Sequence, residues 1–401
     1  MPMIKDFHRT GNNLAGYLCL GLATILLAVS RASPDLLNTF TALGTYIDWK
    51  YTHFLFNYQE GFVKRGLIGE LVAQINGLDA RDVAQTVSYA SLLIMVVMLY
   101  HLFARPWRER SESQGAFLWV LLAISSSATV QHFALDIGRF DAILYIVLLA
   151  QILILSTRAD LHAFYIFLIV TITNALSILI HEAAFFITIP FIYGYWHYLN
   201  PSRRETLWQC ASFLVIFFIT CLISIYGNYK AGSLEEHFFS LLDTHGSWVS
   251  EASVSVLHKT TLLENIQRTM EHGLSVSRAF HHMTLLLVNL PLFYIIFRLV
   301  KKYSGPKTQS FYCLILLSLG PLALYPLGHD HFRWWALAIT NSFMALTLGF
   351  IHSRPFAREA FRLIEEHRRL VVLILFLSVL LGPLGITESY SLSIFMVAAW
   401  L

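Results

Sequence analysis

Eleven long apolar runs, separated by short polar segments, constrain the fold of this chain more than any other feature. A helix needs about 20 mostly apolar residues to cross the hydrocarbon core of a bilayer. The runs cover residues 14–30, 84–104, 115–133, 142–157, 163–180, 183–199, 207–227, 283–300, 309–327, 335–352 and 370–386. The last apolar segment, 390–401, is too short to cross unaided. The pattern predicts an all-α, polytopic transmembrane helical bundle of about eleven spans, or twelve if the last segment also crosses. We expect residues 1–401 to form a single integral membrane domain.

The composition agrees with a membrane protein. Apolar residues make up 56% of the chain and charged residues only 13%, whereas an ordinary globular domain carries about 25% charged residues. The net charge is only +3, and the Lys and Arg residues are scattered along the chain. This balance excludes a soluble enzyme, a nucleic-acid-binding protein and a disordered scaffold.

Lys and Arg gather in alternate loops between the apolar runs, which predicts the orientation of the chain. The basic loops contain Lys5, Arg9, Arg105, Arg108, Arg110, Arg158, Arg203, Arg204, Lys301, Lys302, Lys307 and the segment 354–369. Cytoplasmic loops carry the excess of positive residues, so we expect these loops and the N-terminus in the cytoplasm, with a bacterial inner membrane as the location. The two long loops, about 31–83 and 228–282, are then external, and we expect amphipathic helices in both.

The cytoplasmic loops offer no place for a nucleotide. They are short and basic and contain no Gly-rich phosphate-binding loop, so neither a nucleotide nor a nucleic acid is an expected partner. Histidine is distributed differently, because eleven of the seventeen histidines fall in external loops or at external span ends. These are His53, His132, His181, His237, His245, His258, His272, His281, His282, His329 and His331. The asymmetry indicates a working surface on the extracytoplasmic side.

The first external loop contains a segment, 54–70, in which aromatic and aliphatic residues alternate with charges, as in an interfacial helix. In such a helix Glu60 and Lys64 stack at i, i+4. Glu60 is a candidate catalytic acid or base, and Lys64 with Arg65 forms a candidate phosphate clamp. The alternative is an amphipathic helix that lies on the surface and only braces the bundle.

A pattern of Asp, two residues, Arg and an aromatic residue occurs twice, as Asp136 to Phe140 and as Asp330 to Trp334. Both copies stand at the predicted external start of a span, where charges are costly unless they are paired or used. Asp136 and Asp330 are therefore candidate catalytic residues, and Arg139 with Arg333 would suit a diphosphate ligand. The alternative is an N-cap followed by an interfacial anchor.

Three other external positions complete the candidate site. His181 and Glu182 stand between two apolar spans and are candidate catalytic residues, because an ionisable pair at this depth usually marks function; a solvated turn is the alternative. His329 and His331 flank Asp330 and are candidate substrate-binding residues. Their spacing does not match a helical zinc motif, so we predict no cofactor, with a divalent metal as the alternative.

This layout resembles the polytopic GT-C class of glycosyltransferases and the related envelope polysaccharide polymerases. The features that carry the resemblance are about eleven spans, a long first external loop with acidic residues, and Arg, His and carboxylates at external span ends. It covers the general architecture of most of the chain and no specific motif, and the paired acidic motif of several GT-C families is absent. The resemblance implies a catalytic acid or metal ligand in the first external loop, where Asp48 and Glu60 match.

The resemblance and the charged residues together predict an enzyme. We expect transfer or polymerisation of sugar units from a polyprenyl phosphate or diphosphate donor at the extracytoplasmic face, in cell-surface polysaccharide biosynthesis. A base would deprotonate the glycan acceptor, with Glu60, Asp136 and His181 as candidates. Cations would stabilise the leaving phosphate. The partners are the lipid-linked donor, the acceptor glycan and the bilayer.

Three other functions remain open from the sequence. A transporter or flippase of a lipid-linked or anionic substrate would show interrupted helices and ionisable residues within spans; no span has a charge near its middle. A membrane acyltransferase that modifies an external glycan would use His181 or His329 as base. A non-enzymatic assembly subunit is the third alternative.

Overall fold

The computed structural model describes residues 49–75, 77–109, 113–157, 163–200, 202–258, 266–267, 269–270, 275–386 and 389–390. The predicted span 14–30, the candidate Asp48 and residues 391–401 of the final apolar segment lie outside these residues. Within the described part of the chain every regular element is a helix, and the one β contact is an isolated bridge between Leu384 and Tyr390. The all-α prediction is therefore confirmed for these residues.

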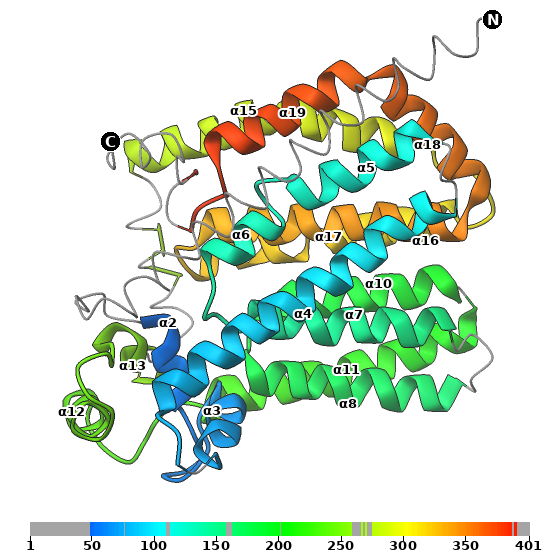
Figure 1. Cartoon of the computed structure of the whole chain (residues 1–401). Coiled ribbons are helices and arrows are strands. Elements are labelled where there is room, and N and C mark those ends of the chain that lie inside the picture. Colours follow the sequence, from blue (N-terminus) through cyan, green and yellow to red (C-terminus); the bar gives the residue numbers. More distant parts are fainter. Residues whose placement is uncertain are drawn as a thin grey trace, which may run out of the picture.

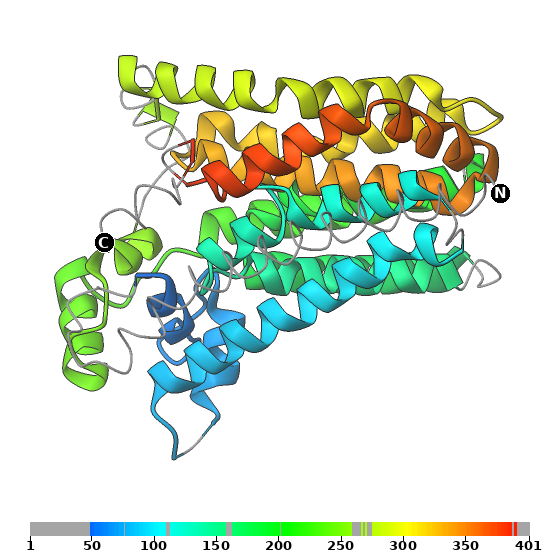
Figure 2. The ribbon, with the colours of Figure 1, turned by 45° about the horizontal axis from the view of Figure 1, so that its top comes forward.

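The bundle consists of fourteen helical segments of the described chain, and the longest of them run back and forth between its two ends (Figures 1 and 2). They are α4 (Ala80–Arg108), α5 (Gln114–Ser125), α6 (Val130–Leu135), α7 (Asp141–Thr157), α8 (Ala163–Ile180), α9 (Ala184–Ile187), α10 (Ile189–Leu199), α11 (Arg203–Tyr226), α15 (Val276–Lys302), α16 (Thr308–Ser318), the 3-10 helix η2 (Gly320–Leu327), α17 (His331–His352), α18 (Arg354–Glu366) and α19 (Arg368–Leu381). Serine or aspartate side chains cap many of their first turns. Asp79, Ser113, Ser202, Ser275 and Ser353 do so for α4, α5, α11, α15 and α18.

Seven helices of the described chain are long and apolar enough to cross a membrane. They are Ala80–Arg108, Gln114–Leu135, Ala163–Ile180, Arg203–Tyr226, Val276–Lys302, Thr308–Leu327 and His331–His352. The apolar helix α7 is shorter, and α19 has 14 residues. The predicted span 183–199 is divided into α9 and α10 at Thr188, just before Pro190. The structure is thus compatible with a multi-pass membrane protein, and the count of eleven spans is not confirmed.

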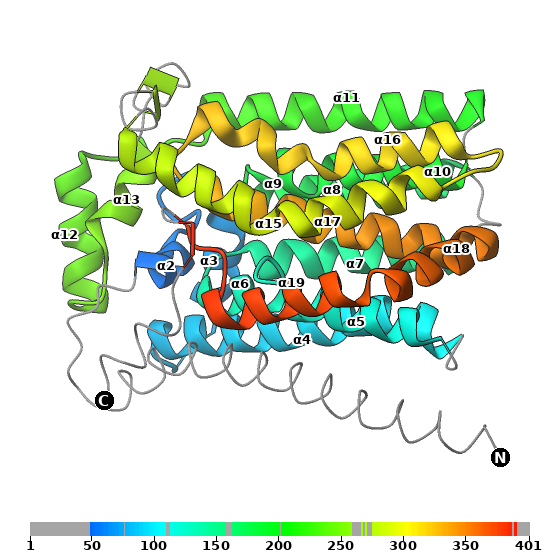
Figure 3. The ribbon, with the colours of Figure 1, turned by 90° about the horizontal axis from the view of Figure 1, so that it is seen from above.

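Burial differs sharply between the helices. In the most apolar 18-residue stretch of α17, 89% of the residues are buried inside the protein, whereas the share is 22% in the corresponding stretches of α11 and α15. Large apolar side chains such as Phe218 on α11 and Leu287 on α15 point outward. Apolar faces of this extent are unfavourable in water, and lipid would solvate them. The central helix is therefore α17, and α11 and α15 form part of the periphery (Figure 3).

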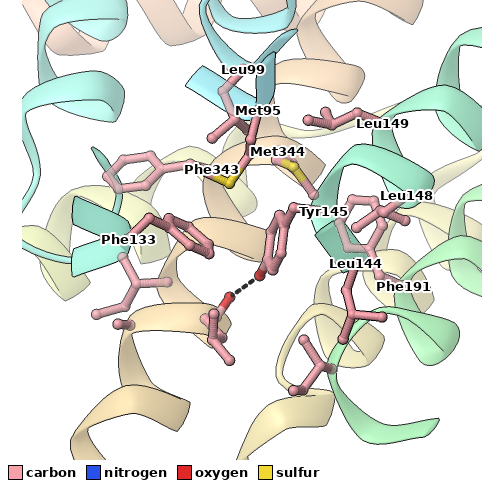
Figure 4. Packing of buried hydrophobic residues seen from close by; sticks show 14 of the residues in the cluster. Met95, Leu99, Phe133, Leu144, Tyr145, Leu148, Leu149, Phe191, Phe343 and Met344 are labelled. Atoms are coloured by element: carbon pink, nitrogen blue, oxygen red, sulfur yellow. Dashed lines mark hydrogen bonds between the residues drawn. The ribbon is translucent and has the colours of Figure 1, made fainter. Parts of the chain in front are cut away.

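The core around α17 combines close apolar packing with a few hydrogen bonds. Tyr145 of α7 lies among Met95, Leu99, Phe133 and Phe343 (Figure 4). Its hydroxyl lies 3.2 Å from the Leu337 carbonyl oxygen and 2.8 Å from Oδ1 of Asn341. A buried hydroxyl needs such partners because an unpaired polar group in the core is costly.

Segments from both long loops pack together at one end of the bundle, at the left of Figure 1. The first loop supplies α2 (Trp49–Thr52), the 3-10 helix η1 (His53–Leu55) and α3 (Gly66–Ala73), and the second supplies α12 (Leu234–His245) and α13 (Glu251–His258). The Ser250 N–H donates to Oγ1 of Thr52 at 2.9 Å, and the Ser253 hydroxyl donates to the Trp49 carbonyl. We call residues 49–73 and 227–258 the loop layer. Helices are thus present in both loops, as the sequence predicts.

The predicted helix over 54–70 is wrong in its first part. Only Gly66–Ala73 is α-helical, and the chain before it turns irregularly, with Arg65 in the left-handed region (φ 64°). The reason is tertiary: the Lys64 N–H donates to the Gly227 carbonyl at 2.7 Å. Gly69 also packs so closely on the Phe56 backbone that a Cβ would lie 1.9 Å from its oxygen. Glu60 and Lys64 are therefore not stacked on one helix face.

Candidate functional site

Six charged side chains lie together where the loop layer packs on the bundle, and we call them the ion cluster. They are Lys50 of α2, Asp136 and Arg139 of the turn between α6 and α7, Asp141 of α7, Asp330 before α17, and Arg333 of α17. Three are acidic and three are basic, so their formal charges cancel. The two recurring sequence patterns are thus brought together, although they lie almost 200 residues apart in the sequence.

Arg333 is the centre of the ion cluster. Its Nε and NH2 donate to the two oxygens of Asp141 at 2.7 and 2.5 Å, and NH1 donates to Oδ2 of Asp330 at 3.1 Å. Such a bidentate pair is among the stronger ionic contacts in proteins. It joins the first residue of α7 to the first turn of α17.

Arg139 connects the cluster to the loop layer. Its NH1 donates to Oδ2 of Asp330 at 2.6 Å, its Nε lies 2.9 Å from Oδ1 of Asp136, and its guanidinium lies 4.4 Å from the centre of the Trp49 ring. Burial by itself would raise the pKa of Asp330, but Arg139 and Arg333 outweigh it and hold that pKa below the usual range. Asp330 is therefore an ionised bridge between two arginines.

Asp136 differs from the other two aspartates of the cluster. Its side chain is only 2% exposed, and Lys50, Arg139 and Arg333 all approach it within 3.6 Å. Nevertheless, neither of its oxygens accepts a hydrogen bond from any residue that the structure describes. Asp136 is therefore held by ion pairs alone, of which the contact between its Oδ1 and Nε of Arg139, at 2.9 Å, is the shortest.

A second ionic pair lies beside the cluster and joins the loop layer to the turn between α8 and α9. Arg65 donates from Nε and NH2 to Glu182, at 3.0 and 2.5 Å. Burial would raise the pKa of Glu182, but Arg65 outweighs it and holds that pKa well below the usual range. The predicted role of Arg65 as part of a phosphate clamp would thus require this pair to separate.

His181 is a buried, neutral imidazole next to that pair. Its Nδ1 accepts the Ala183 N–H at 3.1 Å and lies 3.4 Å from Oε2 of Glu182. Burial, with a further contribution from Arg65, lowers the pKa of His181 to about 3. The ring is therefore uncharged at neutral pH, and the predicted catalytic role of His181 stays a prediction.

His53 of η1 lies between the two ionic groups. It is 5% exposed and contacts Trp49 and Phe56 edge-on, with ring centres 5.9 and 5.3 Å away. Burial lowers its pKa well below the usual value, and the charges of Arg65 and Arg139 add to this effect. Charges from both the ion cluster and the Arg65–Glu182 pair therefore act on the His53 ring.

Glu60 and Lys64 make their contacts elsewhere in the loop layer. Glu60 is exposed and accepts a hydrogen bond from the Tyr229 hydroxyl, beside a cavity of about 150 Å³ that His237 also lines. Lys64 Nζ donates to Oδ1 of Asn228 at 3.1 Å. Their recorded contacts join the two loops to each other, and the predicted catalytic role of Glu60 stays a prediction.

His331 points away from the ion cluster. Residues two apart on a helix do not share a face, so α17 directs Arg333 toward α7 and His331 toward η2 and α15. His331 stacks on Tyr325, with ring centres 4.5 Å apart. His329 lies in the turn before Asp330, and its charge acts on His331. In the described chain no three His, Cys, Asp or Glu side chains converge as metal ligands.

The two sequence patterns contain four members of the ion cluster, Asp136, Arg139, Asp330 and Arg333, but neither Lys50 nor Asp141. Lys50 donates to the Leu135 carbonyl at 2.8 Å and approaches Asp136 from α2. The signal for Asp141 was its position five residues after Asp136, at the start of the same span. Lys50 had no such signal, because only the folding of the loop layer brings it there.

Comparison with known proteins gives no matching family model, no similar curated protein and no similar solved structure. The proposed function is therefore inferred from the contacts, burial and charges of the site residues.

Proposed function

We propose that the protein transfers sugar units from a polyprenyl phosphate or diphosphate donor at the extracytoplasmic end of the bundle, in cell-surface polysaccharide biosynthesis. The observation that carries the proposal is Asp136, a buried carboxylate among three cations that accepts no hydrogen bond from the described residues. Buried charges at the end of an apolar bundle are costly and usually serve function. A base beside cations is the combination that transfer from a phosphate leaving group requires.

In the proposed reaction Asp136 takes the proton of the acceptor hydroxyl. The acceptor oxygen then bonds to the anomeric carbon of the donor sugar, and the bond from that carbon to the phosphate oxygen breaks. The phosphate leaves with the electron pair, and Arg139 and Arg333 stabilise its negative charge. The proton remains on Asp136 until solvent removes it.

Phosphate binding would require one carboxylate to release the two arginines. Asp330 is the best candidate, because its side chain is 29% exposed whereas those of Asp136 and Asp141 are 2% and 3% exposed. Phosphate oxygens would replace Asp330 on Arg139 and Arg333, and Arg333 would remain oriented by Asp141. This exchange keeps the charge of the site nearly unchanged.

The proposed placement of the working face is supported by the basic residues at the opposite end of the bundle. Helix α18 and the end of α15, with Lys301 and Lys302, lie at the end away from the loop layer (Figure 1). Cytoplasmic segments carry such an excess of positive residues. This distribution supports a cytoplasmic position for that end and an extracytoplasmic position for the loop layer.

The test uses the full chain reconstituted in liposomes with a polyprenyl diphosphate-linked saccharide and an acceptor glycan. Asp136→Asn keeps the size of the side chain but removes the base, and we expect turnover to fall by about 10²–10⁴-fold. Product is measured by thin-layer chromatography, with Asp243→Asn on the exposed face of α12 as the matched control that keeps the wild-type rate. Wild-type turnover in Asp136→Asn, or no product from the wild-type protein, would contradict the proposal.

Transport of the lipid-linked substrate is the second candidate, and one observation favours it. Two interrupted helices pack together, since Gly320 at the start of η2 lies against the Phe186 carbonyl and Pro190 at the break between α9 and α10. Asn341 of α17 donates to the Ile187 carbonyl at 2.9 Å and satisfies the broken backbone. Interrupted helices of this kind form substrate sites in many transporters.

The same liposomes distinguish the two candidates. A transporter would move a fluorescent lipid-linked saccharide between leaflets without an acceptor, which dithionite quenching measures. Movement without product, slowed by Asn341→Leu but not by Asp136→Asn, would support transport in place of transfer.

A further inference from the structure

A second polar group lies on the other side of the first turn of α17, and we call it the histidine cluster. It consists of Arg278 and His282 of α15, Tyr325 of η2 and His331 of α17. The rings of His282 and His331 have centres 5.4 Å apart, and His331 stacks on Tyr325 with an angle of 10° between the ring planes. Phe332 also contacts His282, at 4.8 Å. Three helices thus contribute to one compact group.

The hydrogen bonds of the two imidazoles fix which nitrogen carries the proton. His282 Nδ1 lies 2.7 Å from the Arg278 carbonyl oxygen, and His331 Nε2 lies 3.3 Å from the Tyr325 carbonyl oxygen. A carbonyl only accepts, so each of these nitrogens donates. The opposite nitrogens, Nε2 of His282 and Nδ1 of His331, are therefore the ones that remain to interact with a ligand.

Those nitrogens are buried and have no hydrogen-bond partner among the described residues, and the same holds for NH1 of Arg278. His331 is 4% exposed as a whole residue. A buried polar group that is left unpaired destabilises a fold, so several in one place call for an explanation such as a missing ligand.

The four members of the histidine cluster include no carboxylate. The ionisable side chains that act most on His331 are Arg278, His282 and His329, all of them basic. The nearby Asp330 is paired with Arg139 and Arg333 of the ion cluster. An anion at the histidine cluster would therefore be attracted by the guanidinium of Arg278.

The side of α15 that carries His282 continues as an exposed apolar surface. Leu286 and Leu290 follow His282 at four-residue steps, which places them on the same side of the helix, and they are 47% and 61% exposed. In a bilayer these side chains would contact lipid tails. A ligand with a long hydrocarbon chain could therefore place its polar head at the histidine cluster and its chain along α15.

We propose that the histidine cluster binds the phosphate group of an amphiphile, as a site separate from the ion cluster. Phosphate oxygens accept from Arg278 NH1. A phosphate monoester loses its second proton near pH 6, so it can donate P–O–H to a neutral imidazole or accept from a protonated one. A monoanion with one P–O–H therefore satisfies both His282 Nε2 and His331 Nδ1 when one ring is neutral and the other is protonated, and a dianion does so when both rings are protonated. The proposal does not depend on sugar transfer and holds for a lipid headgroup as for free phosphate.

The test measures binding to the full chain in detergent by isothermal titration calorimetry, with dodecyl phosphate, inorganic phosphate and dodecanol as probes. We expect dodecyl phosphate to bind and dodecanol not to bind. Tighter binding of dodecyl phosphate than of inorganic phosphate identifies a lipid headgroup as the source, and equal binding identifies free phosphate. Binding of dodecanol as tight as that of dodecyl phosphate would overturn the proposal, because apolar contact would then explain the affinity.

Variants locate the site. Arg278→Gln and His331→Asn should each weaken dodecyl phosphate binding by tenfold or more, whereas His281→Asn, whose ring nitrogen lies 3.2 Å from the Ser389 hydroxyl, should change it less than twofold. Arg278 is half-exposed, so its replacement leaves the core intact. Asp136→Asn should leave binding unchanged. A loss of binding in Asp136→Asn alone would overturn the proposal by placing the phosphate in the ion cluster, and it would not bear on whether sugar transfer occurs.

Discussion

The two faces of the first turn of α17 carry polar groups of opposite character. Arg333 enters the ion cluster, where three acids and three bases neutralise one another over short distances. His331, two residues earlier, enters the histidine cluster, where the neighbouring charges are basic and buried nitrogens of the described residues lack partners. The ion cluster is therefore balanced in charge, although both oxygens of Asp136 lack a hydrogen bond from the described residues, and the proposed phosphate would complete the histidine cluster.

The difference affects stability as well as function. A buried ion pair contributes little net stability over an apolar pair, but removal of one partner leaves an uncompensated charge. A buried polar atom without a partner contributes nothing, so its removal costs little. Substitutions on the two faces of the same helix turn should therefore have very different effects.

The largest effect is expected for Arg333→Met. The change removes the bidentate cation of the buried Asp141 and leaves Asp330 with Arg139 alone, and it should lower the free energy of unfolding by about 3–5 kcal/mol. Thermal unfolding in detergent, followed by tryptophan fluorescence, measures the loss. Arg298→Met is the matched control, because Arg298 is half-exposed and its recorded contacts are with Tyr294 alone, and it should change stability by less than about 0.5 kcal/mol.

A double variant tests whether charge balance is the cause. Arg333→Met combined with Asp141→Leu removes both members of the bidentate pair, so most of the lost stability should return. Equal losses in the single and double variants would show that packing of Arg333, and not its charge, holds the end of α17.

The intermediate effect is a pH dependence from His181. Its pKa of about 3 lies below the value of about 6.5 in the unfolded chain, so the unfolded state binds more protons between these values. Stability should then fall as the pH decreases from 6.5 toward 3, by at most about 1.4 kcal/mol per pH unit for this one group. At neutral pH the contribution is fully present.

His181→Asn isolates that contribution. The amide can still accept the Ala183 N–H but does not titrate, so the fall in unfolding temperature between pH 6.5 and pH 5 should be smaller than in the wild-type protein. Part of the fall remains because burial also lowers the pKa of His53. Identical slopes in the variant and the wild-type protein would show that His181 is not the buried neutral group described above.

The two faces also show what could be predicted from sequence. The apolar runs and the short charged patterns are local, so the helices and the positions of Asp136, Arg139 and Asp330 at helix ends could be predicted. The pairing of Arg333 with Asp141 could not, because it depends on α7 and α17 being neighbours. The histidine cluster required three helices to be placed together, and only His331 and His282 carried a signal, as histidines near predicted external span ends.

One prediction failed where a tertiary contact overrode the local pattern. The alternating segment before Gly66 is predicted as helix, but the hydrogen bond from Lys64 to Gly227 fixes it as a turn. The predicted span 183–199 contains a break at Thr188, and Pro190 is the signal in the sequence, because proline lacks the N–H that would donate to the Phe186 carbonyl four residues earlier. The break is stabilised because the side-chain amide of Asn341 donates a hydrogen bond to the Ile187 carbonyl.

The smallest effect on stability is expected for His331→Phe, which makes the comparison with Arg333 sharpest. Phenylalanine can keep the contacts with Tyr325 and Trp334 and removes the buried Nδ1 that lacks a partner. It also removes the hydrogen bond from Nε2 to the Tyr325 carbonyl, so stability should stay within about 1 kcal/mol of the wild-type value. Addition of the ligand should make the stabilities of the variant and the wild-type protein differ. At dodecyl phosphate concentrations of 100 times its Kd, the wild-type protein gains about 2.7 kcal/mol, and His331→Phe gains little. A variant that is several kcal/mol less stable without ligand, or that gains as much with it, would mean that both faces of α17 are structural.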